Sequence, residues 1–203
     1  MGLFTFLLVL FQMPAGFEPP HVQQIAPVEG NLNIIASNWV IADLDIDGDG
    51  QVKFGTVLKG HEPFRGMVVA SAGHWTFTPA RTTVPVESHA TAVFLFRPRA
   101  IFADPAPDLS GLGVAAMDKP PIPIRLSDPG YPSNSVAEGE VILELQVTEM
   151  GTIRNVRVVR AVAGLTEFTD RAVRFWRFAP AVWGGVPVRG TVIVVISYLR
   201  PAL

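Results

Sequence analysis

The stretch Trp176-Arg177-Phe178-Ala179-Pro180-Ala181 decides how the rest of the chain is interpreted, because it has an echo 101 residues earlier. The echo is Trp75-Thr76-Phe77-Thr78-Pro79-Ala80, in which Trp, Phe, Pro and Ala keep their relative positions. Tryptophan occurs only four times in the chain, so coincidence explains this match poorly. Self-similarity at a fixed offset indicates a repeated structural unit.

Composition limits the classes of protein that fit. The 203 residues allow one or two domains, and 49% hydrophobic with 17% charged residues predicts a packed core. The net charge of −2 gives no electrostatic basis for binding nucleic acid, and the absence of cysteine excludes disulfides and thiolate metal sites.

No catalytic or cofactor signature is present. The chain contains no Gly-x-Ser-x-Gly, His-Glu-x-x-His, Gly-x-Gly-x-x-Gly or phosphate-loop motif, so we predict neither an enzyme nor a bound cofactor. His61, His74 and His89 match no metal or catalytic spacing, and they are interpreted as surface or partly buried side chains.

The N-terminus carries an apolar run, Leu3 to Phe11, broken only by Thr5. It is shorter than the ~20 residues that a membrane-spanning helix needs, and it is typical of the apolar region of a signal peptide. Residues 1–26 are therefore predicted as a signal-like segment with a flexible lead-in, and export to the periplasm or cell envelope is expected. A truncated gene start or a buried strand is the alternative.

Residues 27–98 are predicted to form a first unit. Asn38 to Ile46 alternates as a half-buried strand does, with Val40, Ala42, Leu44 and Ile46 on one side and Ile41, Asp43 and Asp45 on the other. Gly48-Asp49-Gly50 predicts a hairpin turn before a returning strand over 51–58. A helical stripe over 64–75 and a strand over 84–96 follow.

The hairpin turn also resembles a calcium loop. Asp45, Asp47 and Asp49, followed by Gly50, match the first positions of an EF-hand loop, but Thr56 stands where a bidentate glutamate is required. The three aspartates are thus a weak calcium candidate, and a plain hairpin turn is the alternative.

Residues 99–125 are rich in proline and are predicted to be an extended linker. A tether between two domains is the simplest interpretation, and a motif for a proline-reading module is the alternative.

Residues 126–203 are predicted to form a second unit. Its clearest strand is 140–148, with four apolar residues directed inward and Glu140, Glu144, Gln146 and Thr148 toward water. A returning strand over 152–160, a helix ending before Pro180 and an apolar third strand over 191–198 complete it.

The echo extends across both units. At the offset of 101, Val40 aligns with Val141, Leu44 with Leu145 and Gly50 with Gly151. The predicted fold class is therefore α+β, with two tandem β-β-α-β units, each a three-stranded antiparallel sheet covered by one helix.

The second unit resembles the C-terminal domain of the TonB energy transducers. The matching blocks are Asp128-Pro129-Gly130-Tyr131-Pro132, Gly139-Glu140-Val141, Gly151-Thr152-Ile153, Phe175 to Ala181, and Gly185-Val186-Pro187-Val188. The motif residues carried over are Tyr131, Pro132, Gly151, Trp176, Phe178, Pro180 and Ala181. The first unit is similar to a diverged copy that lacks the Tyr-Pro opening.

The resemblance implies a periplasmic, non-enzymatic domain that binds outer-membrane transporters. In that family an extended transporter peptide adds as a strand beside the last strand of the domain, and inner-membrane motor subunits are further partners. The residues of that strand are Thr191, Val192, Ile193, Val194, Val195, Ile196, Ser197 and Tyr198. One alternative is an accessory or structural periplasmic module without energy coupling, whose two units pair their third strands with each other. The other is a weak calcium-binding secreted domain.

Overall fold

The computed structural model describes residues 16–30, 34–113 and 116–201. The apolar run Leu3–Phe11 lies outside these ranges. Within these ranges there are two helices, α1 (Phe64–Ala72) and α2 (Thr166–Val173), and the rest is mostly strands and turns. The strands are β1 (His21–Gln24), β2 (Asn38–Ile46), β3 (Val52–Lys59), β4 (Thr76–Thr78), β5 (Ala80–Arg81), β6 (Pro85–Val86), β7 (Ser88–Phe96), β8 (Ile122–Arg125), β9 (Gly139–Val147), β10 (Ile153–Arg160), β11 (Arg177–Ala179), β12 (Ala181–Trp183), β13 (Val186–Val188) and β14 (Gly190–Tyr198).

One six-stranded sheet runs through the molecule, in the order β10-β9-β14-β7-β2-β3. Every neighbouring pair is antiparallel except β14 and β7, which lie parallel at the centre. The mixed α+β class is as predicted. The strands predicted for the two units belong to a single sheet, joined through β14 and β7, and not to one three-stranded sheet per unit. Both third strands are apolar on both faces, and each buries its inner edge against the other.

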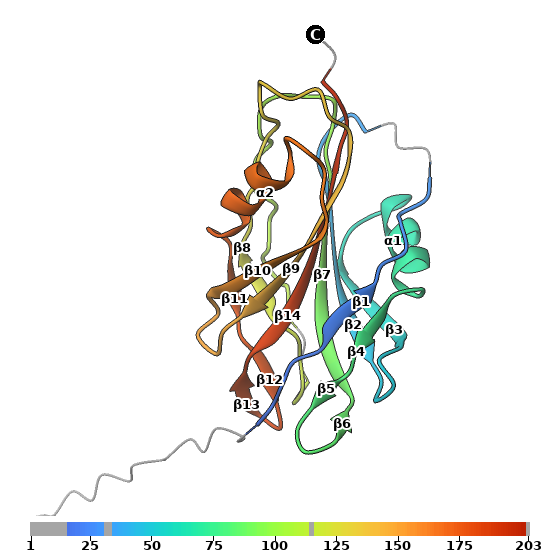
Figure 1. The fold of residues 1–203 in the computed structure, drawn as a ribbon, viewed down its shortest axis with the longest axis vertical. Helices are drawn as coiled ribbons and strands as arrows, with labels where there is room; N and C mark the ends of the chain where they lie inside the picture. The colour runs from blue at the N-terminus through green and yellow to red at the C-terminus, as the bar shows by residue number, and fades with distance from the viewer. Residues whose placement is uncertain (1–15, 31–33, 114–115, 202–203) are drawn as a thin grey trace, which may run out of the picture.

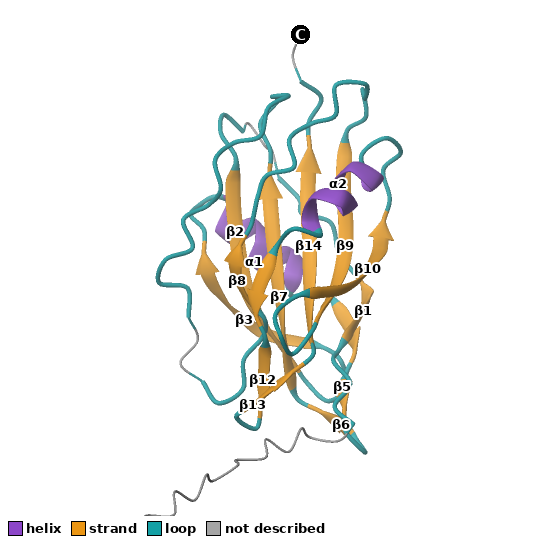
Figure 2. Ribbon diagram, turned by 90° about the vertical axis from the view of Figure 1, so that its left-hand side faces the viewer, coloured by secondary structure: helices purple, strands orange, loops and turns teal. Residues whose placement is uncertain are grey.

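The two helices cover opposite faces of this sheet, as the edge-on view in Figure 1 and the turned view in Figure 2 show. Side chains alternate across each strand, so successive residues enter different cores. On β2, for example, Val40 and Leu44 pack in the core under α1, whereas Ile41 packs in the core under α2. Among the described residues, no helix has the length and apolar character to span a membrane.

Segments outside the predicted units complete both cores. Residues 21–24 form β1, which pairs with β4, and residues 122–125 form β8, which pairs with β11. Trp75 donates its indole N–H to the Ala26 carbonyl at 3.3 Å, and Trp176 donates to the Ser127 carbonyl at 3.1 Å. The predicted lead-in is therefore not flexible over β1, and the predicted linker ends in a packed strand instead of serving only as a tether.

Each of these two segments also forms a hydrogen bond with the opposite half of the sheet. Thr191 on β14 donates its hydroxyl to the Pro20 carbonyl, just before β1. Thr91 on β7 donates its hydroxyl to the Pro121 carbonyl, just before β8. Each segment therefore pairs with a strand of its own half and bonds to a central strand of the other half.

Two glycines set the hairpin turns. Gly50 and Gly151 have φ of +82° and +76°, which residues with a Cβ rarely adopt. A Cβ on Gly50 would lie 1.8 Å from the Phe77 carbonyl oxygen, and one on Gly151 would lie 1.8 Å from that of Phe178. Glycine is required at both turns because the strand that follows each helix packs directly on them.

Candidate functional site

The predicted peptide-binding strand lies in the middle of the sheet. Every residue of β14 is buried, including all eight from Thr191 to Tyr198. One edge pairs with β9, from Gly190 opposite Val147 to Tyr198 opposite Gly139, and the other pairs with β7. The free edge that strand addition at β14 requires is thus filled by the chain itself, in the pairing that the alternative hypothesis described.

The seam between β7 and β14 is long and apolar. Its parallel register runs from Val192 opposite Thr91 to Ser197 opposite Phe96. Ile193 and Val195 are buried in one core, and Val192, Val194 and Ile196 in the other. Each fully buried side chain of this size contributes about 1.5–3 kcal/mol, so removal of β7 would expose apolar surface on both faces. An incoming peptide would have to replace both the hydrogen bonds and this burial.

The unpaired edges of the sheet belong to its outer strands. Among the described strands, β10 pairs only with β9, and β3 pairs only with β2. Each pairing contains register shifts, which are common at sheet edges. β10 lies in the half predicted to bind the transporter peptide, and it is the position in that half where an extended peptide could add without displacing a strand.

The motif residues are mostly structural. Trp176 is fully buried and its ring centroid lies 5.9 Å from that of Trp39, which belongs to the other half. Tyr131 is buried and donates its hydroxyl to the Ala137 carbonyl at 2.9 Å. Phe178 and Ala181 are also buried. Pro180 lies between β11 and β12, and Pro132 follows Tyr131 in the loop before β9. The turn glycine Gly151 is described above.

A buried ion pair joins the two halves near the ends of β7 and β14. Arg97 Nε lies 2.6 Å from Asp128 Oδ1, and both side chains are fully buried. The Asp128 carboxylate also accepts hydrogen bonds from Gly130 N, Asp104 N and the Ser37 hydroxyl. Asp128, the first residue of the motif that ends in Tyr131-Pro132, thus fixes the loop that follows it.

Glu144 on β9 is buried, although the alternation predicted that it faces water. The segment around β1 covers it, and Glu144 accepts hydrogen bonds from Val22 N at 2.7 Å and from Arg157 Nη2 at 2.7 Å. His21 Nδ1 lies 2.8 Å from its other oxygen. Burial opposes the charge of Glu144, but the hydrogen bonds from His21, Arg157 and Val22 N hold its pKa below the ordinary value. The covering strand comes from residues predicted to be a lead-in, so local alternation gave no sign of this site.

The three aspartates of the calcium candidate do not share a common set of contacts. Asp47 Oδ1 accepts the backbone N–H groups of Asp49 and Gln51, and its other oxygen lies 3.1 Å from Lys53 Nζ. These hydrogen bonds hold the pKa of Asp47 below its ordinary value. Asp45 instead lies beside His89, so within the described residues the three carboxylates do not form one donor set.

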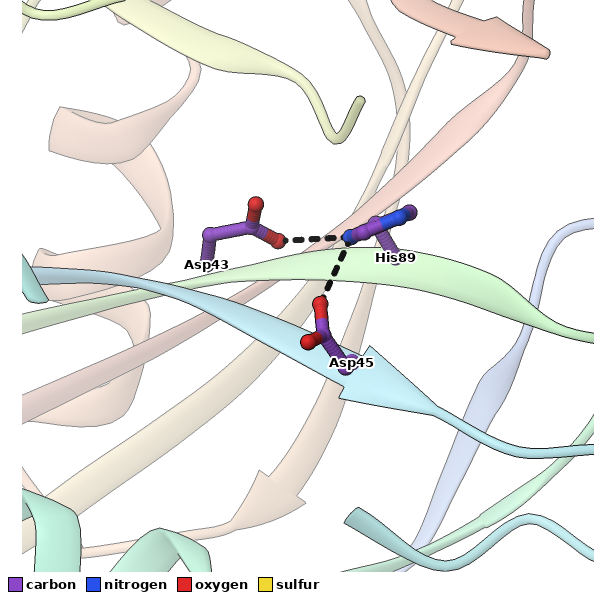
Figure 3. A group of neighbouring side chains, drawn as sticks. All are labelled: Asp43, Asp45 and His89. Atoms are coloured by element: carbon purple, nitrogen blue, oxygen red, sulfur yellow. Dashed lines mark hydrogen bonds and ion pairs between the residues drawn. The ribbon is translucent and has the colours of Figure 1, made fainter. Parts of the chain in front are cut away.

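Asp45 belongs to a group that the sequence did not reveal. Asp43, Asp45 and His89 converge from the neighbouring strands β2 and β7 (Figure 3). His89 Nδ1 lies 3.1 Å from Asp43 Oδ1 and 3.0 Å from Asp45 Oδ1. Their positions in the sequence form no motif, and only the register that sets Asp45 opposite His89 brings them together.

Comparison with known proteins identifies the second half. Residues 128–199 match the family model described as Gram-negative bacterial TonB protein C-terminal. The matched family is a non-enzymatic domain associated with transport. No curated protein and no solved structure matches the chain.

Proposed function

We propose, on the premise that residues 128–199 form a domain of the TonB C-terminal family, that the chain is a non-enzymatic protein of the cell envelope that acts in TonB-dependent transport. Its place in the periplasm is part of this proposal and rests on the family and on the signal-like run Leu3–Phe11. The echo between the two halves supports an origin as two copies of one unit, the first diverged.

The partner that we propose is an extended peptide of an outer-membrane transporter, added as a strand at the outer edge of β10. The observation that carries this choice is the position of β14 between β9 and β7. Of the matched domain's strands in the six-stranded sheet, β10 is the one with an edge that lacks a partner strand. Main-chain hydrogen bonds supply the affinity in this mode of recognition, and the exposed Arg154 on β10 favours acidic residues in the peptide.

A second candidate function is favoured by the same seam. β7 occupies the place beside the last strand that the family resemblance assigns to a transporter peptide. The chain would then be an accessory module whose halves satisfy each other, with no peptide partner. Coupling to inner-membrane motor subunits is a separate hypothesis that neither function requires.

An engineered, reducible disulfide between β7 and β14 distinguishes these functions. Val93 and Val194 face each other across β7 and β14, and the native chain has no cysteine. The double substitution Val93→Cys and Val194→Cys places two thiols at Cα partners of adjacent strands, within reach of a disulfide. Synthetic peptides of transporter N-terminal segments are then titrated against the oxidised and the reduced full chain.

We expect equal binding in both states, with slowed amide exchange in β10 and unchanged exchange in β3, which is the internal control. Binding that disappears on oxidation would instead indicate that β14 opens, and it would overturn the choice of β10. Absence of binding in both states, for peptides that bind other TonB C-terminal domains, would favour the accessory module.

A further inference from the structure

Two carboxylates and an imidazole meet on one face of the central sheet, within the first half of the chain. Asp43 and Asp45 are on β2, and His89 is directly opposite Asp45 on β7. One donor atom from each residue lies within 4.8 Å of the others. Figure 3 shows both carboxylates directed at the same ring nitrogen. The three donors come from two paired strands, so the sheet fixes their spacing.

The second half of the chain gives an internal comparison. Asp43 occupies the position that Glu144 occupies at the offset of 101, and both carboxylates are buried, at 4% and 1% exposure. On the outer strand β10, the residue opposite Glu144 is Arg157, which binds it directly. On the corresponding outer strand β3, the residue opposite Asp43 is Thr56. Among the described residues, His89 is the basic group that contacts Asp43. A buried carboxylate without a permanent cation is costly, so this position favours an added positive charge.

The surface beside the three residues has space for an ion and carries further negative charges. An open hollow of about 370 Å³ beside the cluster is lined by Asp45 and His89 together with Asp118 and Glu87. Lys53 also lines it, but its ammonium group is paired with Asp47. The hollow therefore attracts a cation and gives it access to solvent.

We propose that Asp43, Asp45 and His89 form a binding site for a divalent transition metal of the zinc class. Zinc accepts one imidazole nitrogen and two carboxylate oxygens at about 2.0–2.2 Å, which in a tetrahedron places the donors about 3.3–3.6 Å apart. The separations of 3.1 and 3.0 Å between His89 Nδ1 and the oxygens of Asp43 and Asp45 lie just below this range. Calcium is disfavoured because it takes six to eight oxygen ligands.

The metal would take the place of the proton on His89 Nδ1, which is released to solvent on binding. Water, or a carboxylate of the hollow such as Asp118, would complete the coordination. The ion would then link β2 to β7, and this site does not depend on the proposed role in transport.

The test is metal binding by the full chain after treatment with a chelator. Titration calorimetry with Zn²⁺ at pH 7.5 is expected to give one site per chain, and Co²⁺ is expected to give the visible absorption of a low-symmetry site with nitrogen and oxygen ligands. His89→Ala and Asp45→Asn should each weaken Zn²⁺ binding by at least about tenfold, because each removes one of three protein ligands. Affinity should also increase with pH, since a proton must leave.

Two control variants separate this site from other metal-binding groups. His61→Ala removes an exposed histidine outside the cluster, and Asp49→Asn removes a member of the calcium candidate; neither should change Zn²⁺ affinity. Circular dichroism establishes that each variant is folded, and Asp45→Asn, at a half-exposed side chain, keeps the test valid if His89→Ala unfolds. Lack of Zn²⁺ binding by the native chain, or equal binding by folded His89→Ala or Asp45→Asn, would overturn the proposal.

Discussion

The buried pair of Arg97 and Asp128 provides the sharpest test of how the two halves are joined. Substitution Arg97→Met keeps most of the apolar stem and removes the guanidinium, which leaves the Asp128 carboxylate buried without its cation. Loss of one partner of a buried pair costs about 3–5 kcal/mol. Asp128 keeps hydrogen bonds from Gly130, Asp104 and Ser37, so we expect the lower end of this range.

The matched control is two residues away. Arg99 pairs with Glu138 at 3.0 Å, but the two side chains are 55% and 46% exposed. An exposed pair contributes about 0–1 kcal/mol, so Arg99→Met should have a small effect that salt reduces further.

Urea unfolding followed by tryptophan fluorescence measures both variants. With a slope of about 2 kcal/mol per molar urea, Arg97→Met should lower the midpoint by about 1.5 M and Arg99→Met by less than about 0.5 M. The double variant Arg97→Met with Asp128→Asn should be more stable than the sum of the two single effects predicts, because the uncompensated charge is gone. Equal midpoints for Arg97→Met and Arg99→Met would refute the reasoning.

Three further perturbations test other parts of the structure. Gly151→Ala should destabilise the chain by more than about 1 kcal/mol, since its Cβ would meet a carbonyl oxygen at 1.8 Å, whereas Gly184→Ala, with open space around it, should cost less in the same urea assay. His89→Gln, measured in chelator, should lower the free energy of unfolding below pH 6.5, where His89 of the native chain is protonated in both the folded and the unfolded state. The Asp43 hydrogen bond raises the folded-state pKa of His89, so this difference should vanish as the pH rises through that pKa. An effect that stays constant between pH 5 and pH 9 would contradict this. Trp176→Ala should cost about 3–5 kcal/mol and Trp176→Phe clearly less, because the fully buried indole fills the core under α2, and similar thermal unfolding of both variants would argue against that packing.

Local chemistry made the hairpins and helices predictable from the sequence. Gly50 and Gly151 mark turns that require a positive φ, and Pro180 separates two short strands after α2. Alternation correctly placed Val40 and Ile41 on different faces of β2. These signals depend on near neighbours in the chain, so they can be interpreted without knowing the tertiary structure.

The candidate sites depend on contacts between distant segments, and that is why the sequence did not reveal them. Glu144 has the alternation of a solvated residue and becomes buried because a strand more than 100 residues away lies over it. His89 joins Asp43 and Asp45 through the strand register alone. Pairing of the two third strands is one of two alternatives that the sequence leaves open, because an apolar third strand suits a peptide partner and an internal partner equally well. Their parallel direction was not predicted.

The parallel seam also has a consequence for the order of events in folding. Ala92 and Ile193, which are Cα partners across the seam, are 101 residues apart, so each half must largely form before they meet. Until then each half presents an open, apolar strand edge that another molecule can satisfy equally well. A first half that pairs with the second half of a neighbouring chain forms the same contacts between exchanged partners. Chain concentration during folding, and not only the sequence, therefore determines whether the sheet closes within one molecule or between two.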